Sequence, residues 1–365
     1  MARFEEVFSD VTKEGYKIPT SEYLVTGKYP IIDQGQGKIA GYTNLEKGIF
    51  SDVPAIVFGD HTRNVKYIET PFYLGADGVK ILKCRLQNTD SKYLYYCLSN
   101  ARIPNTGYNR HFKWLKEINI PLPPLDEQRK IAAVLDKVSD LIAKRRQQLD
   151  KLDTLVKARF VEMFGDCLTN PKDWRTKCLE DIAEVGSSKR VFVDELQEEG
   201  IPFYRGTEVG ALAEGKQITP ELFITEQHYA ELCKATGAPQ SGDLLMPSIC
   251  PDGRIWVVNT NEPFYFKDGR VLWVHSIDSS YNSIFLLYTL KDRIMTDYSS
   301  IASGTTFAEL KIFALKKCRI FDVPLEQQNQ FAAFIEQIDK SKLAVIQSLE
   351  KLETLKKTLM QQYFG

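Results

Sequence analysis

The sequence predicts an α+β chain in which two mixed domains alternate with two long helices that pair as an antiparallel coiled coil. The first observation is an internal repeat: residues 124–165 align without a gap with residues 324–365, at an offset of 200, with 14 identities in 42 positions. The second is that a long stretch with a different residue pattern precedes each copy. The third is a heptad pattern of apolar residues in both copies. An internal repeat of this kind defines the overall architecture, so it takes precedence over local features in assigning domains. The expected domains are 1–123, 124–165, 166–323 and 324–365.

The first domain, residues 1–123, has the pattern of an α+β fold. Two β-rich runs, residues 54–58 and 79–82, alternate with turns that contain glycine, and a helix is expected at 91–100. Short apolar runs bounded by glycine, proline and asparagine are typical of strands and their turns.

Residues 124–165 predict one helix of about 38 residues, roughly 57 Å long. Pro124 lies just before it, where a missing N–H costs little, and Gly165 lies just after it, where a left-handed cap is favoured. Apolar residues recur at spacings of four and three, interrupted only by Arg145 and Arg159, which is the seam of a coiled coil. The apolar seam positions are Ile131, Leu135, Val138, Ile142, Leu149, Leu152 and Val156.

Residues 166–323 repeat the pattern of the first domain, with expected strands at 201–204, 243–246, 255–258 and 271–274 and a helix near 283–291. A weak match of residues 110–116 over 305–311, at an offset of 195, suggests that the two halves are diverged duplicates.

The last segment, 324–365, has the same seam as the first helix, broken by Lys342 and Lys356. A long helix with one apolar stripe needs a partner, and the two seams match in length and pattern. Each helix is therefore the expected partner of the other. An antiparallel pair is favoured because it places the two domains at opposite ends and gives approximate two-fold symmetry. The apolar seam positions of this copy are Phe331, Ile335, Ile338, Val345, Leu349, Leu352 and Leu359.

Composition predicts a soluble cytoplasmic protein. No apolar run approaches 18 residues, and the N-terminus has no apolar signal segment. Seven scattered cysteines without a Cys-x-x-Cys pair predict free, mostly buried thiols. The net charge of −1 combines 16 basic and 13 acidic residues in 1–123 with 17 basic and 23 acidic residues in 166–323. A diffuse basic surface is therefore excluded, and any nucleic-acid contact must rest on locally concentrated cations or on a partner.

The sequence contains no catalytic motif that we could identify. It lacks a Gly-x-Gly-x-x-Gly loop, a P-loop, an Asn/Asp-Pro-Pro-aromatic tract and a His-Glu-x-x-His pair, and its four histidines have no metal-ligand spacing. Asp60 and His61 lie together in a turn, which is a plausible place for a functional site, but no nucleophile is associated with them. We therefore expect a positioning role or a base contact for this pair. We predict a chain without catalytic residues, metal or cofactor of its own.

Several tracts resemble the specificity subunits of type I restriction-modification systems. The most specific is the Pro-Leu-x-x-Gln sequence that opens both helices, at Pro124–Gln128 and Pro324–Gln328. The resemblance extends over the whole chain through four further tracts, residues 107–112, 201–208, 303–307 and 361–365.

The resemblance implies two target recognition domains, each of which reads one half of a bipartite double-stranded DNA target. It also implies that the conserved helices set the unread spacer and dock two modification (methyltransferase) subunits. Those subunits methylate adenine with S-adenosylmethionine, and restriction subunits cleave DNA with ATP and Mg. A helix of about 57 Å corresponds to roughly 17 base pairs at about 3.4 Å per step.

Base reading needs side chains with paired donors and acceptors: arginine for guanine, asparagine or glutamine for adenine, and small hydroxyl groups for either. In the first domain the candidates lie in glycine-containing loops and are Gln34, Gln36, Tyr42, Asn44, His61, Thr62, Arg63, Tyr108, Asn109, Arg110 and His111. In the second domain they are Ser188, Lys189, Arg190, Arg205, Arg254, Lys267, Arg270, Thr305 and Thr306. Taken singly, each is more often a solvated turn residue, and Arg205 can simply pair with Glu208.

Two alternatives remain open. A coiled-coil adaptor that binds protein rather than DNA explains the repeat and the near-neutral charge, but not the alternation of two unlike, loop-rich domains with similar helices. A stand-alone methyltransferase or nuclease requires that the isolated chain bind its own cofactor.

Overall fold

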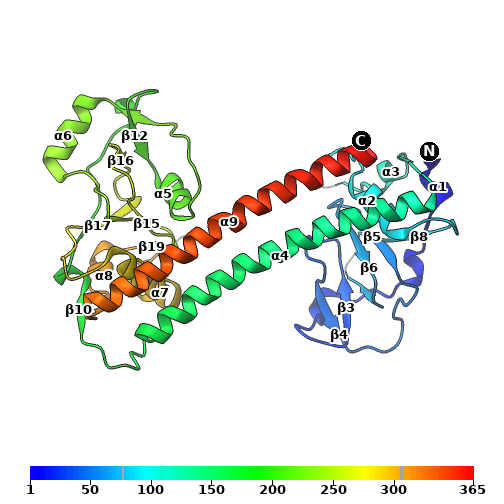
Figure 1. The fold of residues 1–365 in the computed structure, drawn as a ribbon, viewed down its shortest axis with the longest axis horizontal. Helices are drawn as coiled ribbons and strands as arrows, with labels where there is room; N and C mark the ends of the chain where they lie inside the picture. The colour runs from blue at the N-terminus through cyan, green and yellow to red at the C-terminus, as the bar shows by residue number, and fades with distance from the viewer. Residues whose placement is uncertain (76–77, 108, 305–307) are drawn as a thin grey trace. The chain divides into compact units, whose positions relative to one another are not determined.

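The chain forms two compact units in a computed structural model, which describes residues 1–75, 78–107, 109–304 and 308–365. Unit 1 comprises Met1–Gln148 and Ala344–Gly365, and unit 2 comprises Leu149–Leu343. Each unit contains one mixed domain and part of each long helix (Figure 1). The fold is α+β, as predicted from the sequence.

The two long helices begin and end where the flanking prolines and glycines predicted. α4 spans Leu125–Phe164 and α9 spans Leu325–Phe364, 40 residues each. Gly165 follows α4 with a φ of +87°, the conformation of a glycine C-cap. Trp174 Nε1 donates to Phe164 O at 3.0 Å, so this terminal carbonyl has a partner outside the helix. Among the described residues, no helix combines the length and apolarity needed to cross a membrane.

Nine of the fourteen predicted apolar seam positions are buried, and the other five are half-buried. Leu135 of α4 and Phe331 of α9 are 0% exposed, and Val156 of α4 is 4% exposed. Arg145, which interrupts the seam, donates from Nε to Ser348 Oγ at 3.1 Å. This half-buried polar interruption is thus hydrogen-bonded to the facing helix.

In unit 1 the start of α4 packs against the end of α9. Arg145 contacts Ser348, whereas Leu135, earlier in α4, lies in one core cluster with Leu359 and Phe364. Residues later in α4 therefore contact residues earlier in α9, so the two helix segments run antiparallel.

In unit 2 the end of α4 packs against the start of α9. Asp153 Oδ1 accepts from Lys342 Nζ at 2.6 Å, and Phe160 packs on Phe331 with 5.5 Å between ring centroids. Phe164, the last residue of α4, is 0% exposed in this core. Both units confirm the antiparallel pairing, and aromatic residues extend the seam beyond the positions that the sequence analysis identified.

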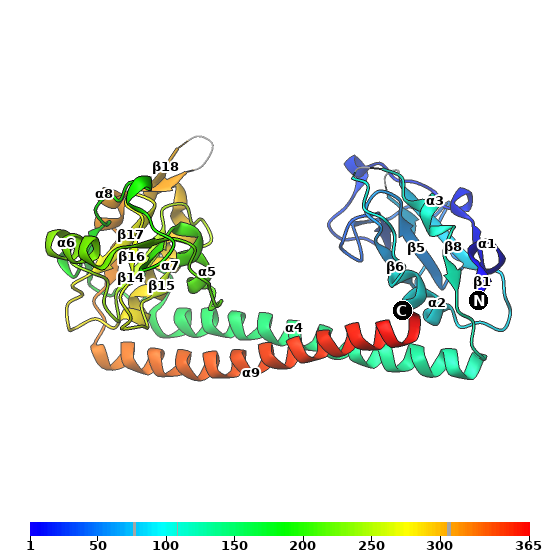
Figure 2. The same cartoon turned by 90° about the horizontal axis from the view of Figure 1, so that it is seen from above.

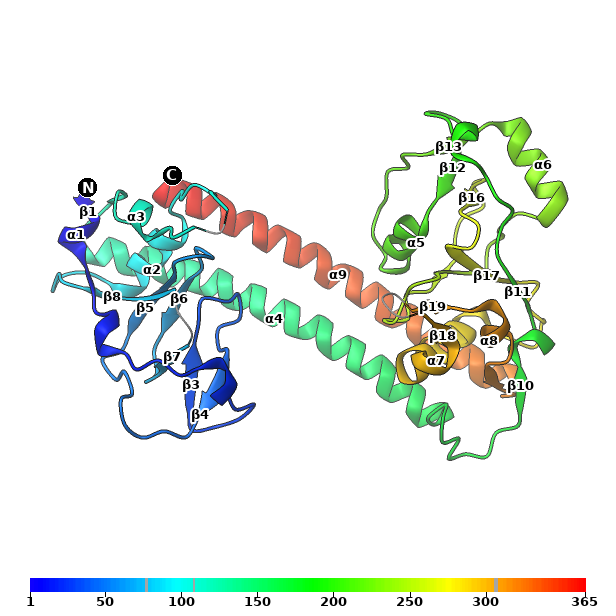
Figure 3. The same ribbon diagram turned by 180° about the vertical axis from the view of Figure 1, so that it is seen from behind.

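Unit 1 contains a four-stranded antiparallel sheet and a three-stranded mixed sheet (Figure 3). The first has the order β2 (Phe8–Asp10), β8 (Val79–Cys84), β5 (Ala55–Gly59) and β6 (Val65–Ile68). The second has the order β4 (Gly41–Thr43), β3 (Tyr29–Ile32) and β7 (Tyr73–Leu74), with β3 parallel to β7. The other described strands are the pair β1 (Ala2–Arg3) and β9 (Asn119–Ile120). The short helices of the domain are α1 (Phe4–Val7), α2 (Ser91–Ser99) and α3 (Phe112–Leu115), with 3-10 turns at Thr12–Glu14 and Thr20–Glu22.

β5 is the central strand of unit 1 and is buried along its whole length. Because side chains alternate across a strand, Ile56 and Phe58 join a core cluster with α2 and the start of α4, whereas Val57 joins a cluster with the three-stranded sheet. α2 therefore lies between the four-stranded sheet and the long helices (Figure 2). Its first turn is capped by Asp90, whose side chain accepts from Tyr93 N at 2.8 Å.

Unit 2 repeats this topology. Its four-stranded sheet has the order β11 (Glu184–Gly186), β17 (Val271–His275), β14 (Leu244–Pro247) and β15 (Trp256–Val257). Its three-stranded sheet has the order β13 (Phe223–Ile224), β12 (Ile201–Tyr204) and β16 (Tyr265–Phe266), with β12 parallel to β16. The other described strands are β10 (Thr176–Cys178) paired with β20 (Arg319–Phe321), and β18 (Ala302–Ser303) paired with β19 (Glu309–Leu310). The helices of the domain are α5 (Gly206–Ala213), α6 (Glu226–Thr236), α7 (Ser283–Ile301) and α8 (Ile312–Lys316), with 3-10 turns at Leu179–Asp181 and Val193–Glu195.

The shared topology supports duplication but corrects its register. Leu115 in α3 and Leu315 in α8 are both 0% exposed, and Ile120 in β9 and Ile320 in β20 are both 0% exposed. The offset of 200 therefore continues upstream of the long helices. The expected match of 110–116 over 305–311, part of which lies outside the described residues, is wrong.

The seven cysteines are free, as predicted, and four of them are buried. Burial raises the pKa of Cys97 and of Cys250 to about 12, so these thiols stay protonated and unreactive at neutral pH.

Candidate nucleic-acid interface

Several segment ends meet in unit 1 next to the carboxyl ends of β3 and β5. Asp60, directly after β5, donates from N to Gly78 O at 2.6 Å and accepts at O from His111 N at 2.8 Å. Gln34, which follows β3, accepts at Oε1 from His61 N at 3.2 Å. We call this set of segments junction 1; its described residues are 34, 60–63, 78 and 109–111.

The same backbone connections occur in unit 2. Ser248, directly after β14, donates from N to Arg270 O at 2.9 Å and accepts at O from Leu310 N at 2.7 Å. Gly206, which follows β12, lies so close that an added Cβ would be 3.3 Å from Arg270 O. We call this set junction 2; its described residues are 205–207, 248–254, 267–270 and 309–310. Because strand order and hydrogen bonds match, the two junctions occupy equivalent places in their units.

Buried groups hold junction 1 together. His111 is 0% exposed, and its Nδ1 donates to Asp60 O at 3.0 Å. The Asp60 carboxylate accepts from Phe112 N at 2.7 Å, at the start of α3. Gly78 has a φ of +88°, and an added Cβ would lie 2.7 Å from His61 Cδ2, so this position requires glycine. Asp60 and His111 therefore position the loops, a role that the sequence analysis considered for Asp60 and His61.

Solvent-exposed polar side chains surround this framework. Asn109, Arg110 and Thr62 are exposed at junction 1, and Gln36 is exposed in the loop that follows β3. Arg63 is half-buried and donates from Nη1 to a backbone carbonyl at 3.2 Å. The candidate Tyr108 lies outside the described residues.

Two candidates of unit 1 lie elsewhere. Asn44 Oδ1 accepts from Lys28 N at 2.9 Å, at the opposite end of β3 from junction 1. Tyr42 is half-buried in β4, where it pairs with Pro30. The structure does not bring either side chain to the junction.

Junction 2 borders a cavity of about 610 Å³. Apolar side chains line part of it, and polar side chains gather around them; the polar lining residues are Arg205, Thr207, Ser248, Arg254, Lys267 and Arg270. The loop with Ser188, Lys189 and Arg190 runs alongside, because Ser188 Oγ donates to Phe266 O at 2.6 Å and Arg190 Nε pairs with Asp268 at 3.2 Å. The candidates Thr305 and Thr306 lie outside the described residues.

The cations of junction 2 are paired with carboxylates. Arg254 Nε lies 2.8 Å from Asp252 Oδ2, Lys267 Nζ lies 3.5 Å from an oxygen of Asp268, and Arg270 Nη1 bonds to Glu309 Oε1. The junction is thus rich in charge but close to neutral, which matches the acidic balance of this part of the sequence.

The Arg205–Glu208 pair is structural. Arg205 N and Nε both donate to the Glu208 carboxylate, at 2.8 and 3.1 Å, at the start of α5. Burial raises the pKa of Glu208, but the hydrogen bonds from Arg205 outweigh it and hold that pKa at about 2. The local pairing that the sequence analysis suggested for Arg205 is therefore present.

Sequence reasoning missed Thr207, Ser248 and Glu309. Thr207 and Ser248 line the cavity, and Glu309 bonds to Arg270. Thr207 lies in the tract 201–208, but the segments that carry these three residues are far apart in sequence and meet only through the sheet.

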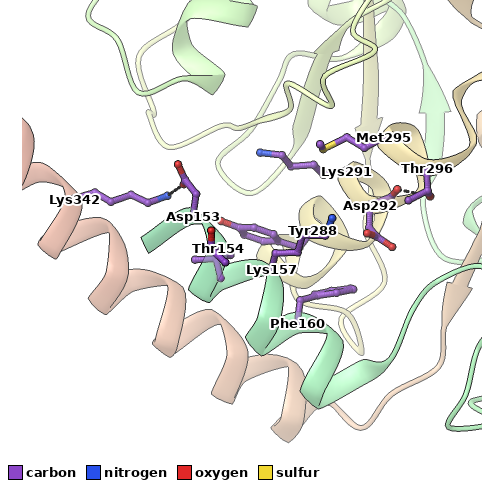
Figure 4. Close-up of a pocket in the computed structure, with 11 residues that line it drawn as sticks. Asp153, Thr154, Lys157, Phe160, Tyr288, Lys291, Asp292, Met295, Thr296 and Lys342 are labelled. Atoms are coloured by element: carbon purple, nitrogen blue, oxygen red, sulfur yellow. Dashed lines mark hydrogen bonds and ion pairs between the residues drawn. The ribbon is translucent and has the colours of Figure 1, made fainter. Parts of the chain in front are cut away.

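A second hollow, of about 530 Å³, lies in unit 2 between the long helices and α7 (Figure 4). Tyr288 and Met295 of α7 face Asp153 and Phe160 of α4 across it, and Lys342 of α9 reaches Asp153 at its edge. Met295 is 55% exposed, so the hollow offers apolar surface to solvent beside the helix pair.

Comparison with known proteins points to one family. The model of the family described as "Type I restriction modification DNA specificity domain" matches residues 2–153 and 171–356. The sequence of a type I restriction enzyme specificity subunit in Haemophilus influenzae is 25% identical over 264 residues, which are 69% of this chain and 65% of that sequence. The MjaVIII specificity subunit of Methanocaldococcus jannaschii is 25% identical over 324 residues, 79% of this chain and 74% of the relative.

The fold is also that of solved proteins. The crystal structure of the S subunit of a type I restriction-modification system from M. genitalium aligns with a TM-score of 0.61 at 16% identity, covering 100% of this chain and 95% of that one. A structure determined in work on the assembly of a type I restriction-modification system aligns with a TM-score of 0.56 at 19% identity, covering 100% and 96%.

Proposed function

The chain belongs to the type I restriction modification DNA specificity domain family, and on this premise we propose that it is the DNA-binding specificity subunit of a type I restriction-modification complex. Junction 1 reads one half of a bipartite DNA target, and junction 2 reads the other half. The observation that carries this proposal is that the two junctions share a framework but differ in the side chains they present.

The exposed groups of the junctions suit the edges of bases. Asn109 and Gln36 near junction 1 carry amides, which pair bidentately with adenine, and Arg110 carries the fork that pairs with guanine. Junction 2 offers guanidinium groups beside the hydroxyls of Thr207 and Ser248. Two frameworks of one geometry with different donors and acceptors recognise two different sequences.

The long helices dock the modification subunits. In unit 1, Val134 and Leu141 of α4 lie seven residues apart and are 38% and 45% exposed; in unit 2, Leu155 of α4 is 47% exposed. Each unit therefore has exposed apolar residues outside the seam. Exposed apolar surfaces of this kind bind partner helices. The hollow beside α7 adds Met295 to this surface in unit 2.

Catalysis resides in the partner chains. Two modification subunits supply adenine methylation with S-adenosylmethionine, and restriction subunits supply cleavage with ATP and Mg. The chain described here is not an enzyme; it contributes target choice, and its helices set the length of the unread spacer.

The proposal is tested by base-modification sequencing of the host genome with and without this gene. We expect one split adenine-methylation motif to disappear on deletion and to return on complementation. An unchanged methylome, together with failure of the reconstituted specificity and modification subunits to retard any DNA, would contradict the proposal and favour a coiled-coil protein adaptor.

A further inference from the structure

Arg270 and Glu309 meet at the edge of the unit 2 cavity although they are far apart in sequence. Ser248 bonds to the backbone of Arg270 on one side and of Leu310 on the other, at 2.9 and 2.7 Å. These bonds place the segment before β17 beside β19. The sheet framework therefore brings the backbone of Arg270 close to that of Glu309, and their side chains pair across this contact.

The Glu309 carboxylate contacts one nitrogen of the Arg270 guanidinium. Oε1 of Glu309 bonds to Arg270 Nη1, and Oε2 lies 3.5 Å from Lys311 Nζ. Glu309 is 30% exposed, whereas Arg270 is 61% exposed. Among the residues that the structure describes, the other guanidinium N–H groups of Arg270 make no hydrogen bond, so they remain available to a ligand.

This arrangement suits a base better than a phosphate. Contacts to phosphates depend on uncompensated positive charge, but a carboxylate touches Arg270 and acidic residues outnumber basic ones in 166–323. Reading guanine depends instead on an oriented fork of two N–H donors aimed at O6 and N7 in the major groove. A carboxylate behind the guanidinium provides that orientation at a reduced entropic cost.

We infer that Arg270 determines specificity for a guanine in the half-site that unit 2 reads, with Glu309 as its positioning residue. This inference rests on the proposed function. The other arginines of the cavity are engaged more tightly: Arg205 is held by both Glu208 and Glu221, and Arg254 lies within 4 Å of both Asp252 and Glu214.

The test uses the specificity subunit reconstituted with its modification subunits and a set of duplexes in which each target base pair is changed in turn. For wild type, replacing one G·C pair in the unit 2 half-site should weaken binding about 10- to 100-fold. Arg270→Ala should abolish this preference at that single pair, leave the other half-site unchanged, and leave the slope of log affinity against log salt unchanged.

Three variants sharpen the result. Glu309→Ala should reduce the same preference, and Glu309→Gln, which keeps an acceptor for the guanidinium, should retain part of it. Arg319→Ala removes an exposed arginine of β20 that does not line the cavity, and should behave as wild type. Thermal unfolding monitored by circular dichroism checks that each variant is folded.

The outcomes distinguish failure of the proposed function from failure of the inference about Arg270. A wild-type complex without any sequence preference contradicts the proposed function itself. A wild-type preference that survives in Arg270→Ala overturns only the inference. A uniform loss of affinity for all duplexes, with a salt slope reduced by about one, shows a phosphate contact and also overturns it, as does a half-site without a G·C pair.

Discussion

One pair of equivalent positions carries opposite charges in the two units, Asp33 in unit 1 and Arg205 in unit 2. Each charge is paired with a residue of opposite charge in its own unit. Asp33 follows β3 and accepts from Lys66, whose side chain is only 7% exposed, at 3.2 Å. Arg205 follows β12, the equivalent strand, and pairs with Glu208. Each pair ties a strand end to a neighbouring element. The backbone arrangement of the junction is thus the same in both units, although the sign of the charge at this position is reversed.

The Glu208 carboxylate should make unit 2 sensitive to acid. Its pKa is about 2 in the folded chain, below its ordinary value of 4.5, because hydrogen bonds from Arg205 outweigh the effect of burial. A lowered pKa stabilises the fold above the unfolded value, and this stabilisation is lost as pH falls from about 4.5 towards about 2. Glu208→Gln should therefore lower the free energy of unfolding by about 1–3 kcal/mol at pH 7, with a difference from wild type that shrinks below pH 4.5.

Urea unfolding of both proteins at several pH values measures this difference. Glu336→Gln is the control, because Glu336 pairs with Lys340 on the exposed surface of α9, where water screens the interaction. A difference at Glu208 that stays constant down to pH 2 would show that packing, and not the charge, is responsible.

The individual residues of the junctions were only partly predictable. The sequence indicated the loops around His61 and Asn109, because glycines and polar side chains mark turns, and the structure brings both loops to junction 1. It could not distinguish the buried His111 from the exposed Arg110 next to it. That difference arises from the hydrogen bond to Asp60, a residue about 50 positions away that only the folded sheet brings close.

At the scale of elements, one glutamine in each helix repeat fastens the helix to a recognition domain. Gln128 is 2% exposed; its Oε1 accepts from Asp90 N at 3.0 Å, and its Nε2 donates to Pro123 O at 2.7 Å. Gln328 is 0% exposed and makes the same two contacts, with Asn282 N at 2.8 Å and with the carbonyl before Pro324 at 2.7 Å. The glutamine of the Pro-Leu-x-x-Gln tract therefore joins the start of α4 to α2, and the start of α9 to α7.

Replacing Gln128 should loosen this connection. Gln128→Ala leaves the N–H of the half-buried Asp90 and the carbonyl of Pro123 without their partner, which should cost about 1–3 kcal/mol of folding free energy. Gln128→Glu keeps the acceptor but loses the donor, so an intermediate loss is expected. Hydrogen exchange at Asp90 measures the opening directly, and Gln148→Ala, an exposed glutamine of the same helix, serves as the control. Unchanged protection at Asp90 in Gln128→Ala would rule out the anchor.

Two leucines on different faces of α4 should separate folding from assembly. Leu135 is fully buried in the unit 1 core, whereas Leu141 is 45% exposed. Leu135→Ala should lower the free energy of unfolding by about 2–5 kcal/mol. Leu141→Asp should change it little but weaken binding of the modification subunits, measured by calorimetric titration. Normal assembly with Leu141→Asp would move the docking surface away from this face.

The helices could be predicted well because their determinants are local. The flanking Pro124 and Gly165 and the apolar spacing all lie within or next to α4, and a periodic signal over 40 residues leaves little ambiguity. The junctions required strand order, which the sequence did not reveal because the strands are two to six residues long. The register of the fainter repeat failed for the same reason, since short matches align by chance.

At the scale of the whole molecule, the duplication gives two units that share one framework. Each unit has its own sheets, its own junction and its own glutamine anchor, and each forms a separate compact body in the pattern of contacts. Arg110 belongs to unit 1 and Arg270 to unit 2, and among the described residues they share no partner. Changes at one junction should therefore leave the other unaffected.

This independence can be measured with a double-mutant cycle. Arg110→Ala should weaken recognition of the unit 1 half-site only, and Arg270→Ala that of the unit 2 half-site only. Because residues without shared partners act additively, the loss of binding free energy in the double variant should equal the sum of the single losses within about 0.5 kcal/mol. Affinities for the full target, for each half-site variant and for random DNA supply the cycle. A coupling well above that limit would mean that the helices transmit the state of one junction to the other, and an equal loss on random DNA would assign Arg110 to the phosphate backbone.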